Sequence, residues 1–167
     1  MSETIILSAS EIKSKLKRIA IEIFENNFQE KEIVLLGIVD RGLFIAEFLA
    51  EEIRKENSLK VQVGSIKIDK ENQLKKPIEL NCDVDLENKA VIVVDDVSNS
   101  GKTLFYALQP LMNINLKKLQ VSVLVERQHK KFAITPDYIG ISVSTTLQEM
   151  IYVKIGIEVN EPIAFLS

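Results

Sequence analysis

Two adjacent carboxylates, Asp95 and Asp96, follow a run of β-branched residues in the segment VIVVDDVSNSGKT, residues 91–103. The residues after them are small or polar and include one glycine: Ser98, Asn99, Ser100, Gly101, Lys102 and Thr103. Backbone N–H groups of such a turn, helped by hydroxyls, bind phosphate. Carboxylates instead accept hydrogen bonds from ribose hydroxyls and can hold a hydrated Mg²⁺. The pattern therefore predicts a site for a ribose phosphate, with its diol over the acids and its phosphate in the turn.

Other phosphate-binding motifs do not fit this segment. The GxxxxGK[ST] spacing of a P-loop is absent, and so is the GxGxxG pattern of dinucleotide-binding proteins. Taken alone, the turn is also compatible with a simple strand-to-helix connection, in which the acids are solvated and Ser98 or Ser100 caps the helix.

Alternating strands and helices are expected to position this turn. The pattern predicts helices at 10–26 (with Ser10 as N-cap), 43–55 and 103–113, and strands at 32–39, 60–68, 90–94 and 119–125, followed by a strand-rich C-terminal third. Such alternation is typical of an α/β fold with a mostly parallel sheet. Ligands of these sheets bind beyond the carboxyl ends of the strands, where the turns 40–42 and 95–103 are both expected.

Composition indicates one ordinary globular domain spanning 1–167. Hydrophobic residues make up 46% of the chain and charged residues 27%. A net charge of −3 and a pI near 5.4 give no overall basic field for non-specific binding to nucleic acid. No signal peptide or membrane-spanning segment is predicted, so we expect a cytoplasmic protein without membrane contact. The single cysteine, Cys82, excludes an internal disulfide and a Cys/His zinc site.

Three segments resemble known proteins. VIVVDDVSNSGKT resembles the phosphoribosyl-pyrophosphate (PRPP) signature of type I phosphoribosyltransferases. GIVDRGLFIAEFLAEEI (37–53) and LVERQHKKFAITPDYIG (124–140) resemble one branch of that family, the pyrimidine-operon attenuators that are also uracil phosphoribosyltransferases. The resemblance implies a central, mostly parallel sheet flanked by helices. It also implies a small hood built from the N-terminal segment and about 126–157, and a flexible loop at about 69–82.

The resemblance also implies a reaction. A nucleobase nitrogen, with uracil preferred, would displace pyrophosphate from C1 of PRPP in the presence of Mg²⁺ and give a nucleoside monophosphate. Two alternatives stay open: a catalytically weak PRPP- or nucleotide-binding regulator of pyrimidine genes, and a purine-type phosphoribosyltransferase. Relatives commonly form dimers, so a homodimer is expected by analogy.

Residue roles follow from the same resemblance. The pyrophosphate loop would consist of Val39, Asp40, Arg41 and Gly42, with a cis peptide bond before or after Asp40. Arg41 would bind phosphate oxygens through its guanidinium group. In the flexible loop this chain has Glu71-Asn72 where the attenuator branch has Tyr-Arg. The positive charge there would have to come from Lys70, Lys75 or Lys76, and Lys70 is assigned to pyrophosphate.

Arg41, Asp96 and Asn99 are the implied catalytic residues, and Asp95 and Asp96 the implied Mg²⁺ ligands, directly or through water. PRPP would contact the acids and the turn through Asp95, Asp96, Ser98, Asn99, Ser100, Gly101, Lys102 and Thr103. At the position of Asn99, purine enzymes have an aspartate that is thought to accept a proton, and attenuators have tyrosine. An asparagine side chain cannot take a proton at neutral pH, which disfavours such a step here.

The implied base pocket would consist of Glu126, Arg127, Tyr138 and Ile141. Purine enzymes have a lysine in place of Glu126 and an aromatic residue in place of Ile141, and attenuators have a lysine at the latter position. Tyr138 is equally compatible with packing in the core. RNA would be a further partner if His129 and its neighbours Lys130 and Lys131 act as the basic segment of attenuators does; the alternative is a solvated loop.

Overall fold

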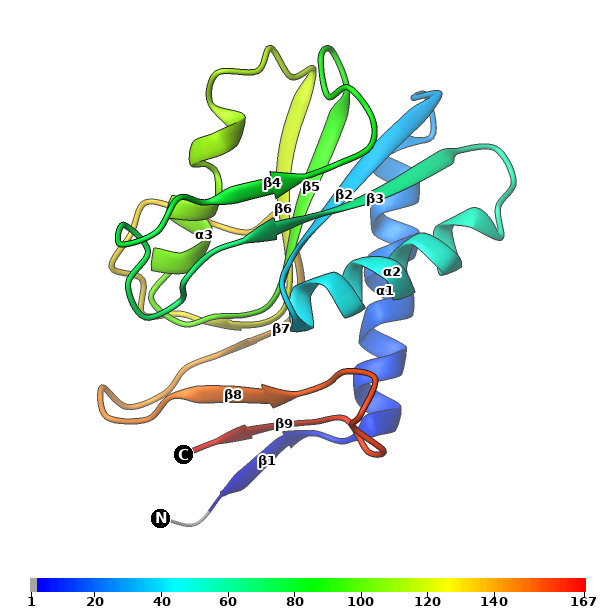
Figure 1. Ribbon diagram of the computed structural model, residues 1–167. Coiled ribbons are helices and arrows are strands. Elements are labelled where there is room, and N and C mark those ends of the chain that lie inside the picture. Colours follow the sequence, from blue (N-terminus) through cyan, green and yellow to red (C-terminus); the bar gives the residue numbers. More distant parts are fainter. Residues whose placement is uncertain (1–2) are drawn as a thin grey trace.

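The computed structural model describes residues 3–167 and contains two sheets (Figure 1). Its helices are α1 (Ala9–Asn27), α2 (Arg41–Arg54), α3 (Lys102–Ala107) and the short 3₁₀ helix η1 (Gln109–Leu111). Its strands are β1 (Thr4–Leu7), β2 (Glu32–Ile38), β3 (Lys60–Lys67), β4 (Glu79–Asn81), β5 (Ala90–Ser98), β6 (Lys118–Arg127), β7 (Tyr138–Val143), β8 (Ile151–Lys154) and β9 (Ile163–Leu166).

The larger sheet has the strand order β4-β3-β2-β5-β6-β7. All of its strands run parallel except β4, which pairs antiparallel with β3 at one edge. Helices α1 and α2 cover one face and α3 with η1 covers the other (Figure 1). The predicted α/β fold with a mostly parallel, helix-flanked sheet is therefore confirmed.

Burial on both faces explains the unbroken apolar sequence of the central strands. Along β2, Ile33 and Leu35 pack into the core under α1 and α2, whereas Val34 and Leu36 pack into the core under α3. Successive side chains of a strand point to opposite faces, so a strand covered on both sides needs apolar residues at every position.

Two helix boundaries differ from those predicted. Helix α1 begins after Ser8 rather than Ser10, because Ser8 and Glu11 form a capping box in which each side chain meets the backbone N–H of the other. Helix α3 ends at Ala107 rather than continuing to 113. Pro110 lacks an N–H group and its ring is incompatible with a continued α-helix, so only the 3₁₀ turn η1 follows.

The hood is a separate antiparallel sheet with the order β1-β9-β8, which lies below the larger sheet in Figure 1. Its limits differ from the expected range of 126–157. Strand β7 pairs with β6 in the larger sheet, and β9 lies beyond residue 157. The segment 69–82 is likewise not one loop, because residues 79–81 form β4. Both differences come from long-range strand pairing, which local sequence does not specify.

Candidate functional site

The acid pair lies inside strand β5, not in the turn after it. Strand β2 pairs with β5 only as far as Val94, whereas β6 pairs with it as far as Ser98. The last part of β5 therefore has one edge without a neighbouring strand. This is where the sheet order changes direction, since β3 lies on one side of β2 and β5 on the other. Such a switch point is the usual ligand site of an open α/β sheet.

The loop after β2 meets this edge. The peptide bond between Val39 and Asp40 is cis, at one of the two positions that the resemblance implied. A Cβ atom on Gly42 would lie 2.4 Å from the carbonyl oxygen of Val94, so only glycine lets the start of α2 approach β5 this closely. The close approach places Arg41, at the first turn of α2, beside the acids.

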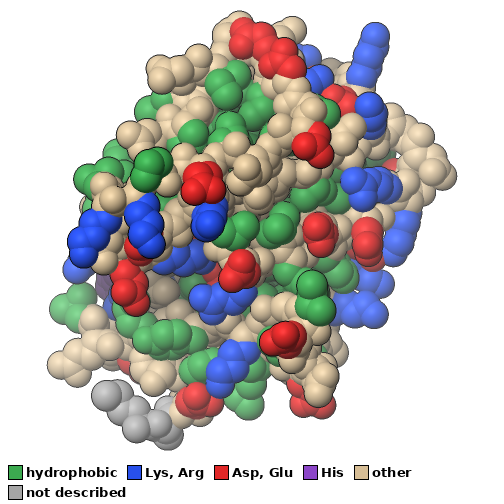
Figure 2. Space-filling view, viewed as in Figure 1, with side chains coloured by type: hydrophobic (Ala, Val, Ile, Leu, Met, Phe, Trp, Pro, Cys, Tyr) green, Lys and Arg blue, Asp and Glu red, His purple; other side chains and the backbone are tan. Residues whose placement is uncertain are grey.

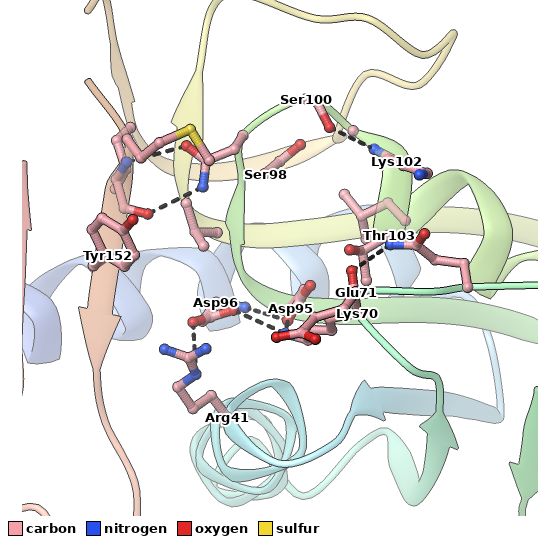
Figure 3. Close-up of a pocket in the computed structure, with 17 residues that line it drawn as sticks. Arg41, Lys70, Glu71, Asp95, Asp96, Ser98, Ser100, Lys102, Thr103 and Tyr152 are labelled. Carbon is pink, nitrogen blue, oxygen red and sulfur yellow. Dashed lines mark hydrogen bonds and ion pairs between the residues drawn. The ribbon is translucent and has the colours of Figure 1, made fainter. Parts of the chain in front are cut away.

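Two basic side chains cover the buried acid pair (Figure 3). Lys70 Nζ lies 3.1 Å from Asp95 Oδ1 and 3.5 Å from Asp96 Oδ1. On the other side, Arg41 Nε lies 3.1 Å from Asp96 Oδ2. Asp95 Oδ1 also accepts a hydrogen bond of 2.9 Å from the backbone N–H of Asp96. Lys70, from the loop after β3, and Arg41, from the start of α2, thus meet at the same pair of acids.

Burial is the largest influence on the ionisation of Asp95. Burial, and then repulsion from Asp96, raises the pKa of Asp95 to about 8, although the charge of Lys70 opposes the rise. Burial also opposes the charge on Lys70, but the two carboxylates outweigh it and raise its pKa. Added positive charge beside Asp95 therefore favours its ionised form.

The turn after β5 offers backbone donors to the cavity. Gly101 has φ +82°, in the left-handed region that glycine tolerates best. Ser100 Oγ accepts a hydrogen bond of 3.3 Å from the backbone N–H of Lys102. Within residues 3–167, no acceptor is found for the backbone N–H groups of Ser100, Gly101 and Thr103. These donors are available to an anion.

Lys130 holds the end of β5, where the turn begins, through hydrogen bonds to Ser98. Its Nζ donates hydrogen bonds of 3.1 Å to the backbone oxygen of Ser98 and 2.7 Å to Ser98 Oγ, and it lies 3.4 Å from Glu126 Oε1. Burial lowers the pKa of Lys130, and Glu126 counteracts this only in part. The backbone N–H groups of Lys131 and Phe132 also bind the carbonyl oxygen of Ser100.

The acid pair, its two basic neighbours and the turn after β5 line one cavity of about 330 Å³. It is lined by Arg41, Lys70, Glu71, Gln73, Asp95, Asp96, Val97, Ser98, Asn99, Ser100, Gly101, Lys102, Thr103, Leu104, Met150, Ile151 and Tyr152. The predicted PRPP-binding residues thus converge on one space. Val39, Asp40 and Gly42 do not line it, and they contribute by placing Arg41.

The residues predicted to bind the base lie elsewhere. Tyr138 begins β7, at the opposite end of the sheet from the turn, and its hydroxyl donates a hydrogen bond of 2.9 Å to Gln120 Oε1. Ile141 packs against the core under α1 and α2. Parallel pairing with β6 fixes the direction of β7, so these two residues do not line the cavity, and their assignment to a base pocket stays a prediction.

Glu126 and Arg127 also do not line the cavity. Glu126 accepts a hydrogen bond of 3.1 Å from Ser142 Oγ. Arg127 donates hydrogen bonds of 2.7 Å to Thr145 Oγ1 and 2.8 Å to the carbonyl oxygen of Thr146. Arg127 thereby holds the segment that leads into β8, and the assignment of Glu126 and Arg127 to base binding stays a prediction.

The hood contributes a wall of the cavity that was not predicted from the sequence. Met150, which directly precedes β8, and Ile151 and Tyr152, at its start, also line the cavity. The segment MIYVKIGI showed only the alternation of a strand, so no local signal marked it as part of a site. Asn99 is tied to this wall, because its Nδ2 donates to the carbonyl oxygen of Ile151 and its Oδ1 accepts from the N–H of Ile151, each at 3.1 Å.

The acid pair suits a divalent cation that is shared with a ligand. Both Asp96 carboxylate oxygens are fully buried and lack a hydrogen-bond donor within residues 3–167, apart from the nearby Lys70 and Arg41 charges. No cluster of three or more His, Cys, Asp or Glu side chains able to hold a metal occurs in that part of the chain. Mg²⁺ commonly binds through one or two carboxylates together with substrate oxygens, and the pair fits that mode.

Comparison with known proteins agrees with this geometry. A family model described as the phosphoribosyl transferase domain matches residues 2–161. The chain belongs to this family. The predicted phosphoribosyltransferase resemblance is thereby confirmed, and with it the prediction of a phosphoribosyltransferase enzyme. In the described residues, 3–167, no helix has the length and apolar character needed to cross a membrane.

Individual relatives share most of their length with this chain. A protein of Clostridium novyi named bifunctional protein PyrR is 37% identical over 162 residues, covering 92% of this chain and 91% of the relative. A protein of the same name from Limosilactobacillus fermentum is 34% identical over 160 residues, with coverages of 90% and 89%. The resemblance to the attenuator branch is thus confirmed.

Solved structures of other phosphoribosyltransferases have the same fold. A hypoxanthine-guanine phosphoribosyltransferase of Bacillus anthracis superposes with a TM-score of 0.70 and 25% identity, covering 89% of this chain and 86% of that one. The hypoxanthine phosphoribosyltransferase of Trypanosoma cruzi gives a TM-score of 0.73 at 17% identity, with coverages of 86% and 83%. The second likeness concerns the fold alone.

Proposed function

We propose that this protein transfers a phosphoribosyl group from PRPP to a nucleobase, with uracil as the preferred base, and releases pyrophosphate. The observation that carries the proposal is the single cavity in which buried acids, two basic side chains and a turn with free backbone donors face one another. PRPP carries a ribose diol, a 5-phosphate and a more highly charged pyrophosphate. These three parts need acids, backbone donors and basic side chains, respectively.

Each part of PRPP has a matching group. The 5-phosphate binds the backbone N–H groups of Ser100, Gly101 and Thr103. The ribose diol binds Asp95 and Asp96. Once the sugar occupies the acids, Lys70 and Arg41 exchange their carboxylate partners for the pyrophosphate oxygens, to which guanidinium and ammonium groups bind strongly.

Catalysis then depends on positioning and on charge. As pyrophosphate leaves C1, negative charge grows on its oxygens, and fixed cations that meet it lower the barrier. Holding the base nitrogen close to C1 lowers the barrier further, because the two reacting atoms are already positioned. Mg²⁺ bound by Asp95 and Asp96 would neutralise part of the pyrophosphate charge.

Uracil is preferred because the sequence resembles the attenuator branch, whose members are also uracil phosphoribosyltransferases, and because Asn99 cannot accept a proton from a purine. The likeness to a hypoxanthine-guanine enzyme at 25% identity keeps a purine base as the second candidate. A panel of nucleobases assayed for pyrophosphate release with PRPP and Mg²⁺ tests this choice. Turnover of uracil is expected, whereas turnover of purines alone would replace uracil in the proposal.

The site assignment has its own test. The Asp95→Asn/Asp96→Asn variant is expected to lose PRPP binding in calorimetry, because the neutral amides neither hold the cation nor attract the diol in the same way. The exposed pair Asp83→Asn/Asp85→Asn serves as a control with the same charge change. Unchanged PRPP affinity in the first variant would refute the assignment.

A regulatory role is distinguished by the same measurements. PRPP with Mg²⁺ should raise the melting temperature of the protein, since a ligand that binds only the folded state stabilises it. A rise without pyrophosphate release from any base would support the regulator in place of the enzyme. Gel filtration with light scattering tests the proposed homodimer.

RNA binding has weaker support. Figure 2 shows acidic and basic side chains interspersed on the viewed face rather than a basic patch. In the segment compared with the attenuators, Lys130 is held by Ser98 and Glu126, and His129 Nε2 lies 2.9 Å from the carbonyl oxygen of Thr145. Titration with structured RNA at low and high salt is the test, because phosphate contacts weaken as salt rises.

A further inference from the structure

Strand β8 exposes one edge of its backbone to the cavity. Within the hood, only β9 pairs with it among the described strands. Met150, just before β8, exchanges backbone hydrogen bonds of 2.9 and 3.1 Å with Ser167, next to β9. In an antiparallel pair, backbone groups of alternate residues point to opposite sides. The N–H and C=O groups of Ile151 and Val153 therefore point away from β9.

Two side chains from outside the hood bind this open edge of β8. Asn99 forms both hydrogen bonds that a neighbouring strand would form with Ile151, at 3.1 Å each. Arg41 Nη1 donates a hydrogen bond of 2.6 Å to the carbonyl oxygen of Val153. Asn99 comes from the phosphate-binding turn and Arg41 from the start of α2, so both links join the hood to the proposed PRPP site.

We propose that Asn99 is a positioning residue that fixes β8 to the phosphate-binding turn and thereby sets where the nucleobase lies relative to the 5-phosphate. This inference rests on the proposed function and identifies how its base site is held in place. The amide side chain of Asn99 links the turn to the wall formed by Met150, Ile151 and Tyr152, and so holds the wall beside the turn.

The geometry separates this role from proton transfer. Both polar atoms of the Asn99 side chain are engaged by backbone groups, and a neutral amide has no proton-accepting capacity at neutral pH. Ile151 itself is buried in the core under α1 and α2, so the strand cannot shift without disturbing that packing. These contacts fit a side chain that positions β8 rather than one that accepts a proton.

Amide hydrogen exchange tests the link without any substrate. The Asn99→Leu variant keeps the side-chain volume and removes both hydrogen bonds. Loss of one such bond is expected to speed exchange of the Ile151 amide by about tenfold. The Met150 amide, which binds Ser167, should change by less than about threefold, as should both amides in the exposed control Asn113→Leu. Unchanged exchange at Ile151 would overturn the proposal.

Steady-state kinetics test the consequence for the base. In Asn99→Leu the KM for the nucleobase should rise by about tenfold while the KM for PRPP stays within about twofold, because the phosphate donors belong to the backbone. General destabilisation would move both constants together and would count against the proposal.

The Asn99→Asp variant separates positioning from proton acceptance. An ionised carboxylate still accepts from the Ile151 N–H but repels the Ile151 carbonyl oxygen, so a higher KM for the base and no gain in kcat are expected. A higher kcat would show that the position serves a proton acceptor and would overturn the proposal. If the parent protein turns over no base, the proposed function fails, whereas exchange at Ile151 still decides whether Asn99 holds β8.

Discussion

Arg41 Nε lies 3.1 Å from Oδ2 of Asp96, a carboxylate with no exposed surface, while Nη1 of the same guanidinium binds the hood at Val153. One side chain thus neutralises a buried charge and joins the hood to the larger sheet. We expect Arg41→Met to lower the free energy of unfolding by about 1–3 kcal/mol, because Asp96 loses a counter-ion and a backbone oxygen loses its donor.

Urea unfolding at pH 7 measures this loss. Arg41→Lys should lose less, since its ammonium group can still reach one of the two partners. An unfolding free energy in Arg41→Met equal to that of the parent would mean that Lys70 alone neutralises the acids.

Lys70 is the loop lysine that reaches the acids. Its replacement is therefore expected to weaken PRPP binding more than replacement of Lys75 or Lys76. The Lys70→Met variant should bind PRPP at least about tenfold more weakly, since a charge-assisted contact to pyrophosphate is lost. Lys75→Met and Lys76→Met remove the same charge from exposed positions of the same loop and should each stay within about twofold of the parent. Calorimetric titration with PRPP and Mg²⁺ makes the comparison, and equal losses in all three would point to a general field effect.

Gly101 is required by both its backbone conformation and its surroundings. At φ +82° an alanine is strained, and its Cβ would lie 2.8 Å from Ile134 Cγ2. Gly101→Ala is therefore expected to destabilise the protein by about 1–2 kcal/mol and to weaken PRPP binding. Adding Ile134→Ala removes the contact but not the backbone strain, so it should not restore PRPP affinity. Full recovery in the double variant would show that the contact alone was responsible.

Glu32, which lies outside the candidate site, makes the free energy of unfolding depend on pH in the acid range. Its carboxylate lies 2.7 Å from Lys89 Nζ and 3.0 Å from Lys60 Nζ and accepts a hydrogen bond from Gln62. Hydrogen bonds from Lys89, Lys60 and Gln62, in that order, lower the pKa of Glu32 from 4.5 to about 2. The folded state thus binds this proton less readily than the unfolded state does, so the stabilisation is complete above about pH 4.5 and disappears as the pH falls through 2.

Glu32→Gln should accordingly be less stable than the parent by about 1–3 kcal/mol at pH 7, and the difference should shrink between pH 4.5 and 2. Chemical unfolding across that range measures it, with the exposed Glu51→Gln on α2 as the control. A difference that does not change with pH would contradict the role of the ion pairs.

The sequence by itself determined the α/β fold, the family and the half of the candidate site that is proposed to bind the sugar phosphate. The reason is locality: the apolar strand, Asp95 and Asp96, and the turn up to Thr103 are consecutive, so their chemistry and their order can be read together. Where local signals conflicted, as with Ser8 and Ser10 before α1, the capping box with Glu11 decided the boundary.

Only the tertiary structure decided how the cavity is closed. Pairing of β7 with β6 placed Tyr138 and Ile141 away from the cavity, and the pairing of β8 with β9 brought Met150 and Tyr152 to its wall. Lys70 and Asn99 likewise gained their partners from segments distant in the chain. Contacts of this kind depend on how strands separated by long loops pair, and neither residue type nor spacing specifies that pairing.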